Sequence, residues 1–146
     1  MKQDNINLVL KDLSGRLPYK PKFKFGNNVY TLYGIDYCVD DDGKWVHCLC
    51  SKGIAPMEIH LCQPYLFPLS SITEEQFYDF YCRFIENDID YADFKEYYVD
   101  GNMWHELLTT IDDCDGVVDW FNERHIDYRG LIPNGLAKDA TGLGIY

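Results

Sequence analysis

The sequence predicts an α+β fold in which an antiparallel meander of three to four strands is followed by helices packed on one of its faces. β-Branched and aromatic residues dominate 29–66, whereas helical periodicity and capping signals dominate 73–137. Strands that precede helices, rather than alternating with them, are typical of this class. With 146 residues, of which 47% are hydrophobic, the chain is expected to fold as one domain.

Residues 1–28 are expected to form a basic N-terminal helix and an extended segment. Apolar residues recur on one face of a helix over 5–14, and Gly15 is a suitable stop. Two prolines and an alternation of Lys and Phe follow. This pattern predicts an extended chain, which could add a fourth strand at 21–26.

Three strands are expected over 29–39, 44–51 and 57–66, because these runs are rich in β-branched and aromatic residues. Asp42-Gly43 between the first two runs is a strong hairpin signal, since glycine adopts the left-handed conformations that tight turns need. The segment KGIAP supplies the turn before the third strand.

A capping box at Thr73–Gln76 marks the start of the helical part, because the two end residues can satisfy each other's backbone N–H groups. The helix that follows has aromatic residues at i, i+3, i+4 and i+7, so one face is expected to be buried. A polar, Tyr-containing connection follows at 87–101, in which a turn of helix is one possibility. Two further helices are expected at about 102–111 and 115–125, the second with Trp120 at the edge of its buried face.

The formal net charge of −11 is unevenly distributed along the chain. Residues 1–25 hold six basic and two acidic residues, a balance of +4, which leaves −15 for the remainder. Between 74 and 127 there are 16 acidic and three basic residues. Such a surface repels nucleic-acid phosphates, so direct nucleic-acid binding is not expected. It attracts basic proteins, although solubility alone is the other interpretation.

The acidic residues of the first long helix and the connection after it are the candidate interface for a basic protein partner. They are Glu74, Glu75, Asp79, Glu86, Asp88, Asp90, Asp93 and Glu96. Their charge would speed the encounter with such a partner, and nearby aromatic rings could serve as anchors.

Six cysteines, at 38, 48, 50, 62, 82 and 114, are expected to be reduced thiols. The first 20 residues contain no apolar stretch long enough for a signal peptide, which favours the cytoplasm. No stretch approaches the roughly 18 apolar residues of a membrane span, so no membrane association is expected.

An alternative function uses cysteine and histidine residues of the second and third strands. Because side chains alternate along a strand, Cys48 would face Cys62 and Cys50 would face His60 if the turn centres near residue 55. Four such ligands suit zinc, and would make the chain a small metal protein or enzyme. Half-buried thiols are the favoured interpretation, because flat strand faces hold ligands too far apart, so no metal or other cofactor is expected.

No motif in the chain indicates an enzyme class. The sequence contains no nucleophile elbow, phosphate-binding loop or dinucleotide-binding glycine motif. The acidic turns at Gly43 and Gly116 lack the first and last ligands of a calcium loop. We therefore expect a non-enzymatic protein with no catalytic residues.

A charged and aromatic cluster lies near the end of the chain, at His125, Asp127, Tyr128 and Arg129. His125 falls at the end of the last predicted helix, where a protonated imidazole interacts favourably with the helix dipole. Asp127 can cap a short turn that follows, and Arg129 lies within reach of it. The cluster is therefore predicted to fix the end of the chain rather than to perform catalysis.

Two segments resemble a family of small proteins from phages and prophages of gut Bacteroidetes. QPYLFPLSSITEEQ (63–76) is similar to a KPYLRPLSSMTEEE-like segment of that family, and VVDWFNERHIDYRGLIPNGLA (117–137) is similar to its DWLNAHHFDYRGLI…GLA-like ending. Gln63 and Phe67 replace a Lys and an Arg, so no anion-binding role is carried over. The resemblance implies a phage setting without a particular activity.

Together these features predict a phage-related accessory protein of the host cytoplasm that binds another protein through its acidic surface. Inhibition of a host defence protein or a nucleic-acid-binding protein is one form that such binding could take, because a compact acidic protein can occupy a groove built for phosphates.

Overall fold

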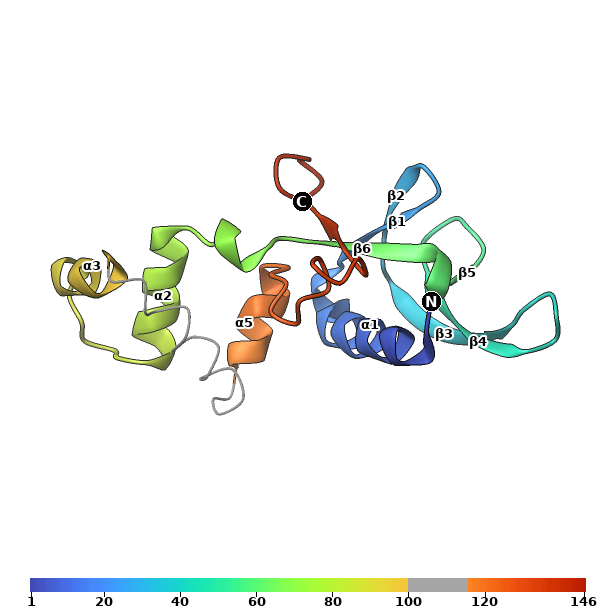
Figure 1. Cartoon of the computed structure of the whole chain (residues 1–146), viewed down its shortest axis with the longest axis horizontal. Helices are drawn as coiled ribbons and strands as arrows, with labels where there is room; N and C mark the ends of the chain where they lie inside the picture. The colour runs from blue at the N-terminus through green and yellow to red at the C-terminus, as the bar shows by residue number, and fades with distance from the viewer. Residues whose placement is uncertain (100–115) are drawn as a thin grey trace.

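The computed structural model describes residues 1–99 and 116–146, and its helices and antiparallel strands confirm the predicted α+β class (Figure 1). The elements in chain order are α1 (Gln3–Arg16), β1 (Lys22–Phe25), β2 (Asn28–Thr31), β3 (Gly34–Val39), β4 (Trp45–Cys50), β5 (Met57–Glu58), β6 (Cys62–Leu66), α2 (Glu74–Phe84), α3 (Tyr91–Val99), α5 (Val117–Glu123) and β7 (Lys138–Asp139). Short 3-10 turns lie at Leu17–Tyr19, Ile59–Leu61 and Leu69–Ser71.

The strands form two sheets rather than one meander. One sheet has the order β2-β1-β6-β7, and the other is an antiparallel meander of β3, β4 and β5. The predicted strand at 29–39 divides at Leu32 and Tyr33, because the Leu32 N–H donates to the Pro21 carbonyl and the Tyr33 N–H donates to the Cys50 carbonyl. The chain therefore passes from the first sheet to the second at these two residues.

The predicted third strand, 57–66, is also divided between the two sheets. Its first two residues form β5 beside β4, and the 3-10 turn at Ile59–Leu61 then redirects the chain into β6. There β6 pairs antiparallel with β1, the predicted fourth strand, and parallel with β7. Because β7 has only two residues, its sequence gave no strand signal.

The sheet half of the molecule has a mainly aliphatic core beneath α1. The helix begins at Gln3, continues through Gly15 and ends at Arg16, so the predicted stop at Gly15 is wrong. Its apolar face is buried against both sheets, and this shared core joins them. The buried members include Val9, Leu13, Phe23, Leu32, Leu49, Met57, Ile59 and Leu66.

The helical half is built around aromatic rings on α2, α3 and α5. The predicted capping box of α2 is present, with the Gln76 N–H donating to Thr73 Oγ1 (3.3 Å) and the Thr73 N–H donating to Gln76 Oε1 (3.0 Å). The connection predicted to be polar contains α3, which the sequence did not indicate as a regular helix. The rings and apolar side chains buried here include Phe77, Phe80, Tyr81, Phe94, Trp120 and Phe121.

The last helix is shorter than predicted, because α5 covers Val117–Glu123 instead of 115–125. Trp120 is 1% exposed, so its predicted position at the edge of the buried face is wrong. Its ring packs edge-to-face on Phe80 and Phe121. The predicted cap Asp115 and the predicted helix 102–111 lie outside the described residues. Figure 1 places α1 and α5 side by side between the two ends of the molecule.

Candidate functional site

The four residues of the proposed zinc site do not come together as predicted. Cys48 lies opposite Glu58, not Cys62, because the β4–β5 register pairs Leu49 with Met57 and the chain then turns away. His60 lies in the 3-10 turn, where its Nδ1 is 3.1 Å from a Glu58 carboxylate oxygen. Among the described residues, no group of three or more His, Cys, Asp or Glu side chains could hold a metal ion.

The thiols of the proposed zinc site, Cys48 and Cys50 of β4 and Cys62 of β6, are poor nucleophiles. Burial raises the pKa of Cys48 to about 12 and that of Cys62 to about 12, and it also raises the pKa of Cys50. Because the thiolate is the reactive form of cysteine, these side chains stay protonated and inert at neutral pH. Cys48 and Cys62 act as buried members of the fold.

Three carboxylates of the candidate acidic interface have partners within the fold. Glu74 accepts a hydrogen bond from the Tyr91 hydroxyl (2.6 Å), which lowers the pKa of this carboxyl, and the Lys95 ammonium lies 3.4 Å away. Asp79 accepts from the Trp120 indole N–H at 2.9 Å. Asp90 accepts from two backbone N–H groups at the start of α3. These three residues therefore organise the helical half.

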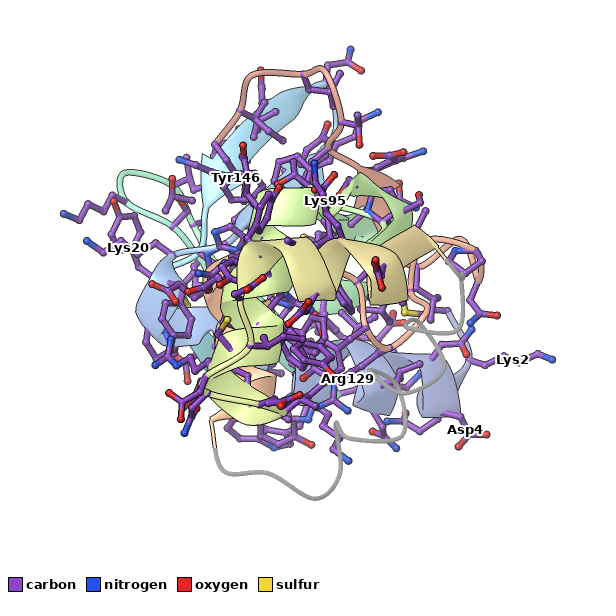
Figure 2. All side chains as sticks on the ribbon, turned by 90° about the vertical axis from the view of Figure 1, so that its left-hand side faces the viewer. Lys2, Asp4, Lys20, Lys95, Arg129 and Tyr146 are labelled. Atoms are coloured by element: carbon purple, nitrogen blue, oxygen red, sulfur yellow. The ribbon has the colours of Figure 1, made fainter. Side chains whose placement is uncertain are left out.

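The other five carboxylates are exposed and form no ion pair with any described residue. Figure 2 faces the end of the molecule that carries them, with α3 in front. They are Glu75, Glu86, Asp88, Asp93 and Glu96. Two large exposed apolar side chains lie in the same part of the chain. Ile85 (39% exposed) directly follows α2, and Tyr91 (40% exposed) begins α3. We call these five carboxylates the free acidic surface.

Asp127 forms the cap that the sequence predicts. Its two carboxylate oxygens accept from the backbone N–H groups of Leu131 (2.8 Å) and Ile132 (2.7 Å), and the side chain is buried. The backbone on either side of it extends β6, because the Phe67 N–H donates to the His125 carbonyl and the Asp127 N–H donates to the Phe67 carbonyl. The segment is thereby fixed to the sheet.

Arg129 does not pair with Asp127 as predicted, because both oxygens of that carboxylate are already bonded to backbone N–H groups. Its Nε instead lies 3.6 Å from Asp12 of α1. The guanidinium groups of Arg129 and Arg16 both lie over the Tyr128 ring, at 4.6 and 5.4 Å from its centroid. The cluster therefore includes residues from the N-terminal helix.

Asp12 and Arg16, which are not among the predicted site residues, form a fully buried ion pair. Arg16 Nε and Nη2 donate to the two Asp12 carboxylate oxygens at 2.7 and 2.9 Å, and Nη2 also donates to the Ile126 carbonyl at 2.7 Å. The available signal was the i,i+4 spacing of an acid and a base on the apolar face of α1. We call Asp12, Arg16, Asn122, Asp127, Tyr128 and Arg129 the polar seam, because they lie between the two cores.

His125 is neutral, so its predicted role as a charged group at a helix end is wrong. Burial, followed by the positive charges of Arg16 and Lys22, lowers its pKa from 6.5 to about 4. Its backbone is left-handed, with φ of 54°. Its ring stacks on Tyr146 at a centroid distance of 4.0 Å. Both rings line a cavity beside the start of α2.

Comparison with known proteins finds no matching family model, no similar curated protein and no similar solved structure. The resemblance to small phage proteins therefore stays a prediction. Within the described residues, no helix combines the length and apolar character needed to cross a membrane.

Proposed function

We propose that this chain is a non-enzymatic, phage-related accessory protein of the bacterial cytoplasm that binds a basic protein partner. The observation that carries the proposal is the free acidic surface. Glu74, Asp79 and Asp90 have partners within the fold. Five neighbouring carboxylates have none among the described residues, so their charge is available to another molecule.

The exposed apolar side chains supply binding affinity, which surface charge alone does not provide. Rim charges mainly increase the association rate, whereas large side chains buried at the centre of an interface provide most of the affinity. Ile85 and Tyr91 are suited to that second role, because each is about two-fifths exposed beside the free acidic surface. In a phage setting, the partner could be a host defence protein whose basic groove normally receives nucleic-acid phosphates.

Affinity capture from a gut Bacteroidetes lysate tests this proposal when the wild type is compared with two matched variants. The first, Glu75→Gln/Asp88→Asn/Glu96→Gln, removes three charges from the free acidic surface. The second, Asp4→Asn/Asp41→Asn/Asp42→Asn, removes three exposed charges from the sheet half. We expect the first variant to lose the partner and the second to retain it. Equal capture by all three proteins would contradict the proposal.

The salt dependence of binding to the captured partner tests the electrostatic part separately. Exposed charges are screened over about 8 Å at physiological ionic strength, so the affinity should fall as salt rises. An affinity that is unchanged between low and high salt rejects a charge-driven interface. Metal analysis of the purified protein tests the alternative, since stoichiometric zinc would favour a metal protein.

A further inference from the structure

A cavity of about 420 Å³ lies where the start of α2, the end of α5 and the tail after β7 meet. Phe67, Ile126 and Tyr146 contribute apolar wall, while Thr73, Gln76 and His125 contribute polar groups. Small-molecule sites commonly have volumes of roughly 300–1,000 Å³ and combine an apolar lining with a few polar groups. This cavity has both properties.

The His125 side chain is one of the polar groups that line this cavity. The side chain is 8% exposed and its Nδ1 is fully buried without a hydrogen-bond partner among the described residues. A proton on Nδ1 would be a buried, unsatisfied donor, and such groups are rare. We therefore assign the proton to Nε2, which is not among the fully buried, unpaired side-chain atoms. His125 thus offers an N–H donor to a molecule in the cavity.

Two features hold this imidazole in place. The ring stacks on Tyr146, with an angle of 22° between the ring planes. The Tyr146 hydroxyl is itself fixed, because it donates to the Tyr65 carbonyl (2.7 Å) and accepts from the Lys22 N–H (2.8 Å). A donor held this way loses little conformational entropy when a ligand binds.

The capping box of α2 leaves two more donors on the cavity lining. Gln76 Oε1 accepts from the Thr73 N–H, so the unused part of this amide is its NH₂ group. Thr73 Oγ1 accepts from the Gln76 N–H, so the hydroxyl proton remains unused. Glu123 also lines the cavity, and its Oε2 accepts from Arg124 at 3.1 Å. Thr73, Gln76 and His125 contribute unused donors, and the Arg124 guanidinium lines the cavity beside Glu123, so a ligand that brings acceptors suits this lining.

We propose that this cavity binds a small organic carboxylate with a flat, apolar body. The two carboxylate oxygens accept from His125 Nε2–H, the Thr73 hydroxyl and the Gln76 NH₂ group. The body of the ligand packs on Phe67, Ile126 and Tyr146. The positive end of the α2 dipole points to the same place, which favours a negative group over a neutral one.

Benzoate is a suitable probe because it combines a carboxylate with a flat ring, and benzylamine is the matched probe of opposite charge. We expect saturable changes in the NMR signals of the His125 ring and the Gln76 side-chain amide when benzoate is titrated into the full chain. Benzylamine should cause no such change at the same concentrations. A benzoate titration without saturable changes at His125, or equal binding of both probes, would overturn the proposal.

Gln76→Glu is the most informative variant. Glutamate keeps the capping box but replaces the NH₂ donor of the cavity lining with a carboxylate oxygen, which is an acceptor. The fold should remain as stable as the wild type, while benzoate binding weakens at least tenfold. His125→Asn should weaken it similarly, since Asn tolerates the left-handed backbone but is too short to place its amide at Nε2. His60→Asn is the control and should bind as the wild type does. Unchanged affinity in a folded Gln76→Glu protein would refute the assignment.

Discussion

The two halves of the molecule are stabilised by different kinds of side chain. Aliphatic residues from α1 and both sheets form the core of the sheet half, whereas rings from α2, α3 and α5 form the core of the helical half. Aliphatic packing depends mainly on buried area, while ring pairs add an orientation preference. The two cores share no residues, and the polar seam contributes bonds between them, since Arg16 of α1 donates to the Phe121 and Ile126 carbonyls.

Arg16 shows how a charged residue of the seam is accommodated although it is buried, whereas the Asn122 amide and Arg129 Nε are buried without a hydrogen-bond partner among the described residues. A buried charge is tolerated when its hydrogen bonds are complete, and each bond then specifies a geometry that apolar contacts do not. Arg16 satisfies this condition by bonding to Asp12 and to the Ile126 carbonyl, which lies 110 residues away in the chain. Apolar contacts in the cores can rearrange, whereas the hydrogen bonds of the polar seam require one geometry. We therefore expect the largest effects from substitutions in the seam.

The largest effect is expected for Asp12→Ala. This substitution leaves Arg16 buried without its carboxylate and removes the carboxylate that pairs with Arg129, so it should destabilise the fold by roughly 3–5 kcal/mol. Urea denaturation measures the loss. The double variant Asp12→Ala/Arg16→Met is the control, and it should recover much of the stability because no unpaired charge remains at Arg16. If the single and double variants are equally unstable, the ion pair is not the source of the effect.

His125 makes the stability depend on pH, with a smaller effect. The folded chain keeps the imidazole neutral down to about pH 4, while an unfolded chain takes up the proton near pH 6.5. Stability from this group is therefore complete above pH 6.5 and falls as the pH drops towards 4, by about 3 kcal/mol in total.

Urea denaturation at a series of pH values, with the wild type compared to His125→Asn, isolates this contribution from those of other titrating groups. The wild type should lose more stability than the variant between pH 6.5 and 4, and the two curves should run parallel above pH 7. Parallel curves over the whole range would show that the histidine is not neutral in the fold.

The parts of the fold that the sequence predicted correctly depend on neighbouring residues. The capping box needs only Thr73 and Gln76, and the Asp127 cap needs only the next five residues. The hairpin at Gly43 is similarly local, with its left-handed φ of 77° and its N–H bonded to the Asp40 carbonyl. In these cases the interacting groups are close in the chain, so their spacing is sufficient.

Several of the errors concern interactions between distant residues. A continuous β-type run concealed the passage between sheets at Leu32, because the Pro21 carbonyl that receives its N–H lies in another segment. The sequence indicates only that Arg16 is one of the basic N-terminal residues, since nothing in its neighbourhood points to the Ile126 carbonyl. The proposed cavity is also composed of distant segments, and therefore no motif marks it.

A smaller effect is expected for Gly15→Ala, which tests the contact between α1 and α5. In an exposed helix this change stabilises by up to about 1 kcal/mol. Here the added Cβ would lie 2.8 Å from Asn122 Nδ2, so Asn122 must move and the fold should lose roughly 1–3 kcal/mol. Gly15→Ala/Asn122→Ala, measured by urea denaturation beside Asn122→Ala, provides the control. In the Asn122→Ala background the glycine substitution should become neutral or stabilising.

The smallest effect is expected for Thr73→Ala, which acts on one helix of the helical half. The variant loses the acceptor of the Gln76 N–H, and removal of such a cap costs about 1 kcal/mol. Thr73→Ser keeps the hydroxyl and should be close to the wild type in thermal unfolding. Amide hydrogen exchange should show the loss in the first turn of α2, while Val9 and Leu13 in the sheet half keep their protection. If protection falls equally in both halves, the seam couples them so tightly that they unfold as one unit, and the two cores are not separable in stability.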